Sequence, residues 1–168
     1  MNNLRAELEV SYNAVKGYLH AMELGYFIFR IPPFHQRIAR AIKKERKAYF
    51  FDWMRAESPP AQFENFIAVS LLSLITLWND RGFGRYELWY LRTRDGDETD
   101  FLLTYNQRPW LLMEAKLSEK TIARHHLAHA RQLGNIPFVQ IIAADGVTER
   151  GGKNHWVVSA SRLLSGWN

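Results

Sequence analysis

The sequence predicts an α/β fold, with a mixed sheet flanked by helices. Apolar residues recur at helical spacing between Gln62 and Asn79, whereas β-branched and aromatic residues dominate the runs that follow. A strand that leads through a helix into another strongly apolar strand implies a parallel crossover. From Gln62 onward, the expected order of elements is therefore α-β-β-β-α-β.

The composition indicates a globular protein, with 47% hydrophobic and 23% charged residues among 168. The sequence contains no cysteine, which excludes disulfides and thiolate zinc sites and fits a reducing compartment. The longest apolar run, Phe66 to Trp78, is shorter than the roughly 20 residues that span a bilayer. The first residues lack the apolar core of a signal peptide. We therefore expect a cytoplasmic protein with no membrane partner.

The first expected elements are a short helix and a strand. Ser11 is a suitable N-cap for a helix that ends at Gly25. Residues 26–31 are typical of a strand, which the two following prolines close. Residues 47–52 fit either a further strand or a turn, because their apolar members are consecutive rather than alternating.

The long helix and the elements after it make up most of the predicted fold. A helix-entry signature at Ser58, Pro59 and Pro60 opens the helix, and the apolar periodicity continues to Asn79. Strands are expected at residues 86–92, 98–105, 110–116, 138–143 and 155–159. Further helices are expected at residues 121–133 and 160–164.

Two acids and a lysine stand on neighbouring predicted strands. Side chains alternate along a strand, so Glu114 and Lys116 project from the same face. Pairing with the adjacent strand can bring Asp100 to the same place. Ionisable groups with apolar neighbours such as Phe101 and Leu112 are costly unless they pair or hold a metal. We therefore expect Asp100, Glu114 and Lys116 to converge at one end of the sheet.

This residue set suits the cleavage of phosphodiesters, which needs oxygen ligands for a hard cation, an activated water and positive charge. Asp100 and Glu114 would hold magnesium or manganese, and Lys116 would orient the water and stabilise the transition state. Glu64, in the long helix, is the candidate for a third metal ligand. The alternative is structural: Glu114 and Lys116 form an ion pair, and Asp100 merely starts a strand.

Two further groups of residues allow binding interpretations. The net charge is +5, and a basic cluster suits either phosphate contacts or a solvated face. This cluster contains Arg37, Arg40, Lys43, Lys44, Arg46 and Lys47. His125 and His129 are four positions apart, which fits either a transition-metal pair or a solvated or phosphate-facing helix.

Five segments in order resemble the C-terminal domain of a widespread group of archaeal and bacterial AAA-type ATPases. That domain has an uncharacterised function and a PD-(D/E)XK nuclease-like fold. The matching segments are residues 47–52, 63–65, 88–92, 98–101 and 113–116. The resemblance implies a restriction-endonuclease-like core. It also assigns the four positions of the nuclease motif to Glu64, Asp100, Glu114 and Lys116.

Residues 10–33 are similar to the end of the winged helix that precedes this domain in those ATPases. The resemblance implies a partial winged-helix segment and basic linker over residues 1–46, followed by the nuclease-like domain over residues 47–168. The leading helices of a winged helix are missing, so the chain looks like a fragment or a truncated relative. Thr99 replaces the proline of the motif, and no phosphate-binding Gly-rich loop exists, so the chain is not an ATPase by itself.

Two hypotheses remain at this stage. The first is a magnesium- or manganese-dependent nuclease, with DNA favoured as substrate. The second is a non-catalytic module of the same fold that binds nucleic acid or a protein partner. The presence of all four motif residues favours the enzyme, whereas the truncated surroundings favour the module.

Overall fold

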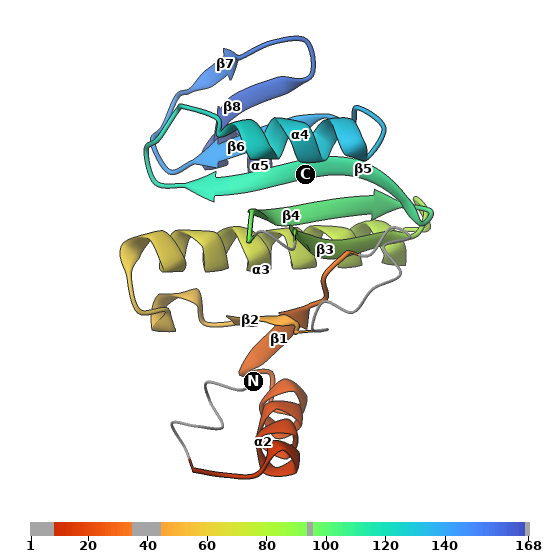
Figure 1. Cartoon of the computed structure of the whole chain (residues 1–168), viewed down its shortest axis with the longest axis vertical. Helices are drawn as coiled ribbons and strands as arrows, with labels where there is room; N and C mark the ends of the chain where they lie inside the picture. Colours follow the sequence, from red (N-terminus) through yellow and green to blue (C-terminus); the bar gives the residue numbers. More distant parts are fainter. Residues whose placement is uncertain (1–8, 35–44, 94–95, 167–168) are drawn as a thin grey trace.

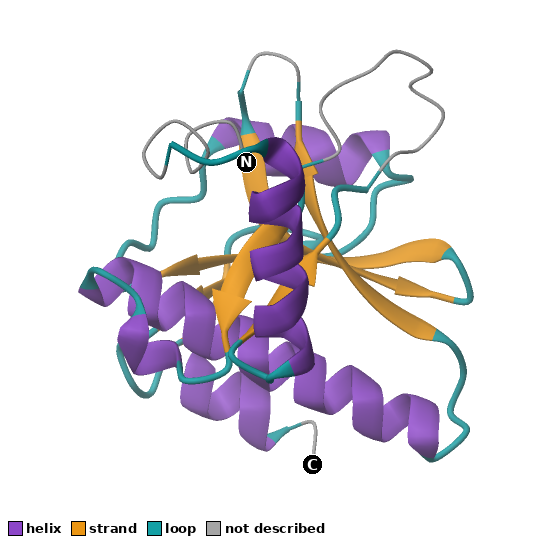
Figure 2. Cartoon of the chain, turned by 90° about the horizontal axis from the view of Figure 1, so that it is seen from below, coloured by secondary structure: helices purple, strands orange, loops and turns teal. Residues whose placement is uncertain are grey.

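A computed structural model describes residues 9–34, 45–93 and 96–166 of the chain. Arg37, Arg40, Lys43 and Lys44, which belong to the predicted basic cluster, lie outside the described residues. The strands cross the middle of the molecule, with helices on either side (Figure 2).

The N-terminal part consists of one helix and a two-stranded sheet. Helix α2 (Tyr12–Leu24) begins as predicted, because the Ser11 side chain accepts a hydrogen bond from the Ala14 amide. Strand β1 (Ile28–Ile31) pairs antiparallel with β2 (Lys47–Phe50). The first strand starts later than predicted, because Tyr26 has a left-handed φ of 56°. Helix α2 stands beyond this small sheet, away from the main one (Figure 1).

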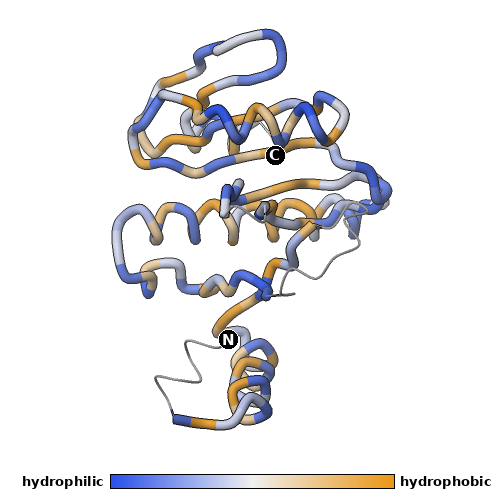
Figure 3. The backbone as a smooth tube through the Cα atoms, viewed as in Figure 1, coloured by the Kyte–Doolittle hydropathy of each residue, from blue (hydrophilic) through white to orange (hydrophobic). Residues whose placement is uncertain are grey.

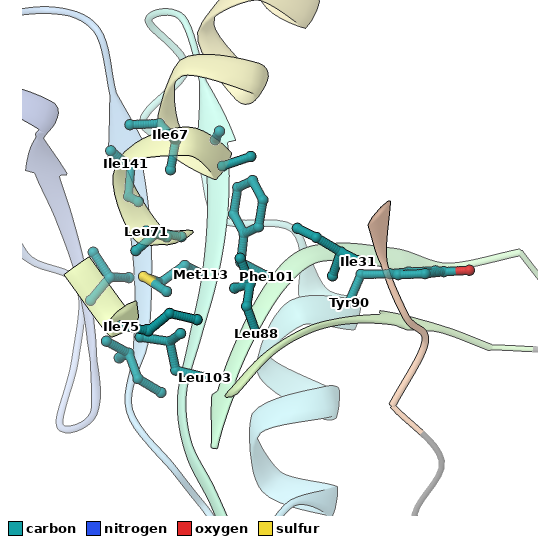
Figure 4. Packing of buried hydrophobic residues seen from close by; sticks show 14 of the residues in the cluster. Ile31, Ile67, Leu71, Ile75, Leu88, Tyr90, Phe101, Leu103, Met113 and Ile141 are labelled. Atoms are coloured by element: carbon teal, nitrogen blue, oxygen red, sulfur yellow. The ribbon is translucent and has the colours of Figure 1, made fainter. Parts of the chain in front are cut away.

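A short 3-10 helix, η1 (Trp53–Arg55), leads into the long helix α3 (Pro59–Asp80). The cap is Ser58, with a proline in the first turn, so the predicted entry signature is confirmed. By length and composition alone α3 could cross a membrane, with a mean hydropathy of 1.3 over its best window. In this fold it packs along the sheet and contributes Ile67, Leu71 and Ile75 to the core (Figure 4).

The main sheet has six strands, in the order β3-β4-β5-β6-β8-β7. Its elements are β3 (Tyr86–Arg92), β4 (Glu98–Tyr105), β5 (Arg108–Lys116), α4 (Arg124–Gln132), β6 (Phe138–Ile142), β7 (Thr148–Arg150), β8 (His155–Ser159) and α5 (Ala160–Ser165). The first three strands are antiparallel, and β5, β6 and β8 are parallel. The predicted α-β-β-β-α-β order and the parallel crossover through α4 are therefore confirmed.

Two strands of the main sheet, β7 and β5, also differ from the sequence prediction. Strand β7 is new; all three of its residues are exposed, so it has no apolar alternation that could signal it. Strand β5 begins at Arg108 and includes Pro109, which the sequence placed in a turn. Proline is tolerated there because the β4–β5 register shifts between Leu103 and Thr104, and β6 pairs with β5 only from Leu112 onward.

The sheet carries a hydrophobic core on each face. On the α3 side, Phe101, Leu103 and Met113 pack against the long helix (Figure 4). On the other side, Leu102 and Leu112 belong to a smaller cluster with Ala130 of α4. Figure 3 shows hydrophobic segments along the strands and α3, and hydrophilic ones at the turns between strands. The candidate site lies at the sheet end where α3 begins.

Candidate active site where two strands separate

Strands β4 and β5 stop pairing through their backbones next to the two predicted acids. Their register runs from Tyr105↔Arg108 to Phe101↔Met113. Beyond that point, the Asp100 amide donates to Glu114 Oε2 at 3.1 Å, and the Ala115 amide donates to Asp100 Oδ2 at 3.1 Å. Each carboxylate therefore accepts a hydrogen bond from a backbone amide of the opposite strand, where regular pairing would use a backbone carbonyl oxygen. These two bonds bring the two acids together.

Burial makes this pair electrostatically unusual. Asp100 is 7% exposed and Glu114 is 5% exposed. Burial and the neighbouring charge of Glu114 raise the pKa of Asp100 to about 6, although Lys47 acts in the opposite direction. Two carboxylates this close favour a cation or a proton between them.

Lys116 lies at the rim of this pair. Its Nζ is 2.8 Å from Glu114 Oε1, and its side chain is 40% exposed. Burial alone lowers the pKa of Lys116, but the bond to Glu114 and the negative charges of Glu114, Asp100 and Glu119 together outweigh burial and leave that pKa raised. The ammonium is therefore charged, with one side on the acid and the other open to solvent. The predicted convergence of Asp100, Glu114 and Lys116 is present in the structure.

Glu64 comes to the same place from the first turns of α3. A pocket is lined by all four predicted residues, together with Ser58, Pro60, Ala61, Ala115, Leu117, Ser118 and Glu119. Glu64 Oε1 accepts from the Tyr49 hydroxyl at 2.7 Å and from Lys47 Nζ at 3.0 Å. Glu64 therefore faces the pocket, as expected, and is held by two side chains of β2.

Lys47 is the residue whose position the sequence did not indicate. Sequence reasoning grouped it with the basic cluster, whereas the structure turns its ammonium toward Glu64, Glu98 and Asp100. Arg46, the other described member of that cluster, is exposed. The sequence contained one indication of this position of Lys47. Lys47 and Tyr49 are two residues apart, which puts both side chains on one face of a strand.

The donor chemistry of the pocket suits a hard divalent cation, because carboxylate oxygens are the ligands that magnesium and manganese prefer. Asp100 and Glu114 fit as two such ligands. Among residues 9–34, 45–93 and 96–166, however, no group of three or more acidic or histidine side chains is arranged to hold a metal. Glu64, which also lines the pocket, is paired with Lys47 at 3.0 Å.

A buried histidine pair on α4 lies beside the site, and one of its two rings comes near Glu114. Thr99 Oγ1 lies 2.8 Å from His126 Nδ1 and 2.9 Å from His129 Nδ1. Because one hydroxyl carries one proton, it donates to one ring and accepts from the other. His126 Nε2 is 3.7 Å from Glu114 Oε1. Burial lowers the pKa of His126 to about 3, so its ring is neutral.

His129 is buried, so the solvated-helix interpretation is wrong at this position, and its ring centre lies 5.8 Å from that of His125. His126 and His129 share Thr99, while His125 Nε2 contacts the Glu98 carbonyl oxygen at 3.2 Å. In the resemblance to the ATPase C-terminal domain, Thr99 stands at the position where that family's motif has proline. Its hydroxyl gives this position a hydrogen-bonding role that proline cannot fill.

Comparison with known proteins gives one family match. The model of a family described as Domain of unknown function (DUF8612) matches residues 1–53. That region covers α2, β1 and β2, includes Lys47 and ends before α3. No curated protein matches the chain.

One solved structure is weakly similar. It is a refined half-complex from a tetradecameric assembly of Thermococcus gammatolerans McrB AAA+ hexamers with bound McrC. The identity is 12% and the TM-score 0.40, over 61% of this chain and 27% of that chain.

Proposed function

We propose that this chain is a metal-dependent nuclease-like domain that hydrolyses phosphodiesters in nucleic acid, with DNA favoured and magnesium or manganese as cofactor. The observation that carries the proposal is the buried contact between Asp100 and Glu114, with Lys116 at its rim. The α-β-β-β-α-β order supports a restriction-endonuclease-like core for this site.

In this proposal, Asp100 and Glu114 hold the metal, with Glu64 as a possible third ligand from α3. The bound ion would supply Lewis acidity and a more acidic water. Lys116 has the exposure needed to meet a phosphate at the pocket mouth while Glu114 fixes its direction. Its charge would stabilise the negative charge that develops on the phosphate during attack.

Substrate approach is favoured by the net charge of +5, because long-range attraction raises the local concentration of a polyanion. The basic cluster adds phosphate contacts in this proposal, through Arg46 and the residues outside the described ranges. A cytoplasmic location fits the absence of cysteine and the reducing conditions there.

The direct test compares Mn²⁺ binding by calorimetry with nicking of supercoiled plasmid. Asp100→Asn and Glu114→Gln keep an oxygen acceptor for the strand amides while removing the charge. We expect both variants to lose metal binding and cleavage. Glu149→Gln is the matched control, because Glu149 is an exposed acid of β7 that pairs with Lys120. Cleavage that persists equally in both site variants would contradict the proposal.

A second candidate is a non-catalytic module that binds nucleic acid or a protein partner. The specific observation in its favour is that Lys47 already pairs with two acids of the pocket, Glu64 and Asp100. Among the described residues, no buried side-chain polar atom lacks a hydrogen-bond partner. If this second candidate is right, the wild-type protein takes up no Mn²⁺ and cleaves no DNA. Calorimetry and plasmid nicking measure both outcomes.

A further inference from the structure

Lys47 stands where acids from two elements of the fold converge. Its Nζ lies 3.0 Å from Glu64 Oε1 on α3, and 2.5 Å from Glu98 Oε1 and 3.2 Å from Asp100 Oδ1 on β4. An ammonium has three N–H donors, and here three carboxylates surround it. Lys47 thus has the oxygen environment that a small cation would have.

The surroundings hold this ammonium in place. The side chain is 20% exposed, and its Nζ is 5.7 Å from the centre of the Tyr90 ring. Burial alone lowers the pKa of Lys47, but the charges of Asp100 and Glu64 raise it overall, so the group stays charged. Lys116, by contrast, contacts one acid and is more exposed.

Two of the acids that hold Lys47 are also ligands in the proposed function. A carboxylate oxygen of Asp100 or Glu64 that coordinates a divalent ion interacts more weakly with an ammonium, and two cations a few ångström apart repel each other. Glu98 lies outside the proposed ligand set and also pairs with Arg92. It could therefore keep the ammonium after the other two acids release it.

We infer that Lys47 is the resident cation of this site, and that it competes with the divalent metal for Glu64 and Asp100. This inference rests on the proposed metal site. It makes Lys47 a positioning residue that sets metal affinity: the metal binds when the ammonium withdraws toward Glu98. The chain is thereby stable without metal, and its metal uptake is weak.

The test is a calorimetric Mn²⁺ titration of wild type, Lys47→Met and Lys116→Met. Methionine keeps the apolar stem of lysine and removes the charge. We expect Lys47→Met to bind Mn²⁺ at least about tenfold more tightly than wild type, a change equivalent to about 1.4 kcal/mol. Lys116→Met is the matched control, and its gain should stay below about fivefold, the range of an exposed ion pair.

The Mn²⁺ dependence of thermal unfolding gives a readout that a purely structural role of Lys47 would not move. Without metal, Lys47→Met leaves three carboxylates facing one another, so its Tm should fall below that of wild type. Mn²⁺ should restore the Tm of Lys47→Met and have little effect on wild type, because a ligand stabilises only the state that binds it. Adding Asp100→Asn to Lys47→Met should remove the gain in affinity.

If Lys47→Met does not fold, Glu98→Gln is the alternative variant, because it removes the charge toward which the ammonium withdraws and changes no proposed metal ligand. The ammonium should then stay on Glu64 and Asp100, and the affinity for Mn²⁺ should fall. If wild type, Lys47→Met and Glu98→Gln bind Mn²⁺ with equal affinity, the role of Lys47 is overturned, whereas the proposed metal site is not. Absence of Mn²⁺ binding in every variant would overturn both this inference and the proposed function.

Discussion

The backbone amide of Asp100 donates a hydrogen bond to Glu114 Oε2 at 3.1 Å. The Ala115 amide donates in the same way to Asp100 Oδ2, so each acid also completes the pairing of the two strands. Replacement of either acid by alanine would leave a buried amide without a partner, which costs about 1–3 kcal/mol. Asp100→Asn and Glu114→Gln keep an oxygen acceptor for these amides, so they separate the chemistry of the site from the stability of the fold.

Lys116→Ala should separate metal binding from cleavage. Lysine is not a metal ligand, so Mn²⁺ affinity should stay equal or rise once the repulsion of the cation is gone. Cleavage should fall, because the charge on the phosphate loses its partner. Calorimetry and plasmid nicking measure the two effects. A parallel loss of both would show that Lys116 acts only by holding Glu114 in place.

Asp100 should make stability depend on pH in weakly acidic solution. Its pKa is about 6 in the folded chain against an ordinary value of 3.8, so the folded state binds the proton more tightly than the unfolded state. This stabilising contribution is complete below the unfolded pKa and is lost as pH rises to about 6. The full change is on the order of 3 kcal/mol.

The measurement is urea unfolding of wild type and Asp100→Asn between pH 4 and pH 7. Stability of the wild type should fall relative to the variant as pH rises through this window. Asp80→Asn, at the end of α3, is an exposed control that should follow wild type. Parallel curves for wild type and Asp100→Asn would contradict the raised pKa. Mn²⁺ affinity should also weaken below about pH 6, because a proton competes with the metal for Asp100.

Thr99→Val should destabilise the fold by about 1–3 kcal/mol, because it leaves two buried imidazole nitrogens without a partner. Thr76→Val is the control: Thr76 is an exposed residue of α3, and its change should stay within about 0.5 kcal/mol. Chemical denaturation measures both. A Thr99→Val variant as stable as the control would show that water replaces the threonine hydroxyl.

The basic cluster should give weak binding to nucleic acid that declines steeply as salt rises, because phosphate contacts release counterions. Reversal of charge at Lys43 and Lys44 should weaken binding to every sequence alike, since phosphate contacts carry no sequence information. The same reversal at Lys120 and Lys153, exposed and outside the cluster, is the control. Fluorescence anisotropy over a salt series measures these affinities, and a flat salt dependence would exclude the cluster as a phosphate surface.

The sequence by itself determined the α-β-β-β-α-β order from α3 to β6 and the meeting of three site residues. Periodicities of 3.6 and 2 residues identify the buried faces of α3 and the strands, because they follow from backbone geometry alone. The meeting of Asp100, Glu114 and Lys116 could be predicted from the sequence, because these residues lie on two strands that a short turn joins. Their separation along the chain is small, and adjacent strands of a hairpin pair locally.

Only the tertiary structure decided which side chains meet this group from farther away. Lys47 and Asp100 are 53 positions apart, and β2 pairs with β1 rather than with the six-stranded sheet. The contact between Thr99 and His126 likewise depends on how α4 packs on the sheet. Periodicity tells which face of an element a side chain occupies, but packing of whole elements decides what that face meets. That is why a lysine that looked like part of a basic surface lies among the acids of the site.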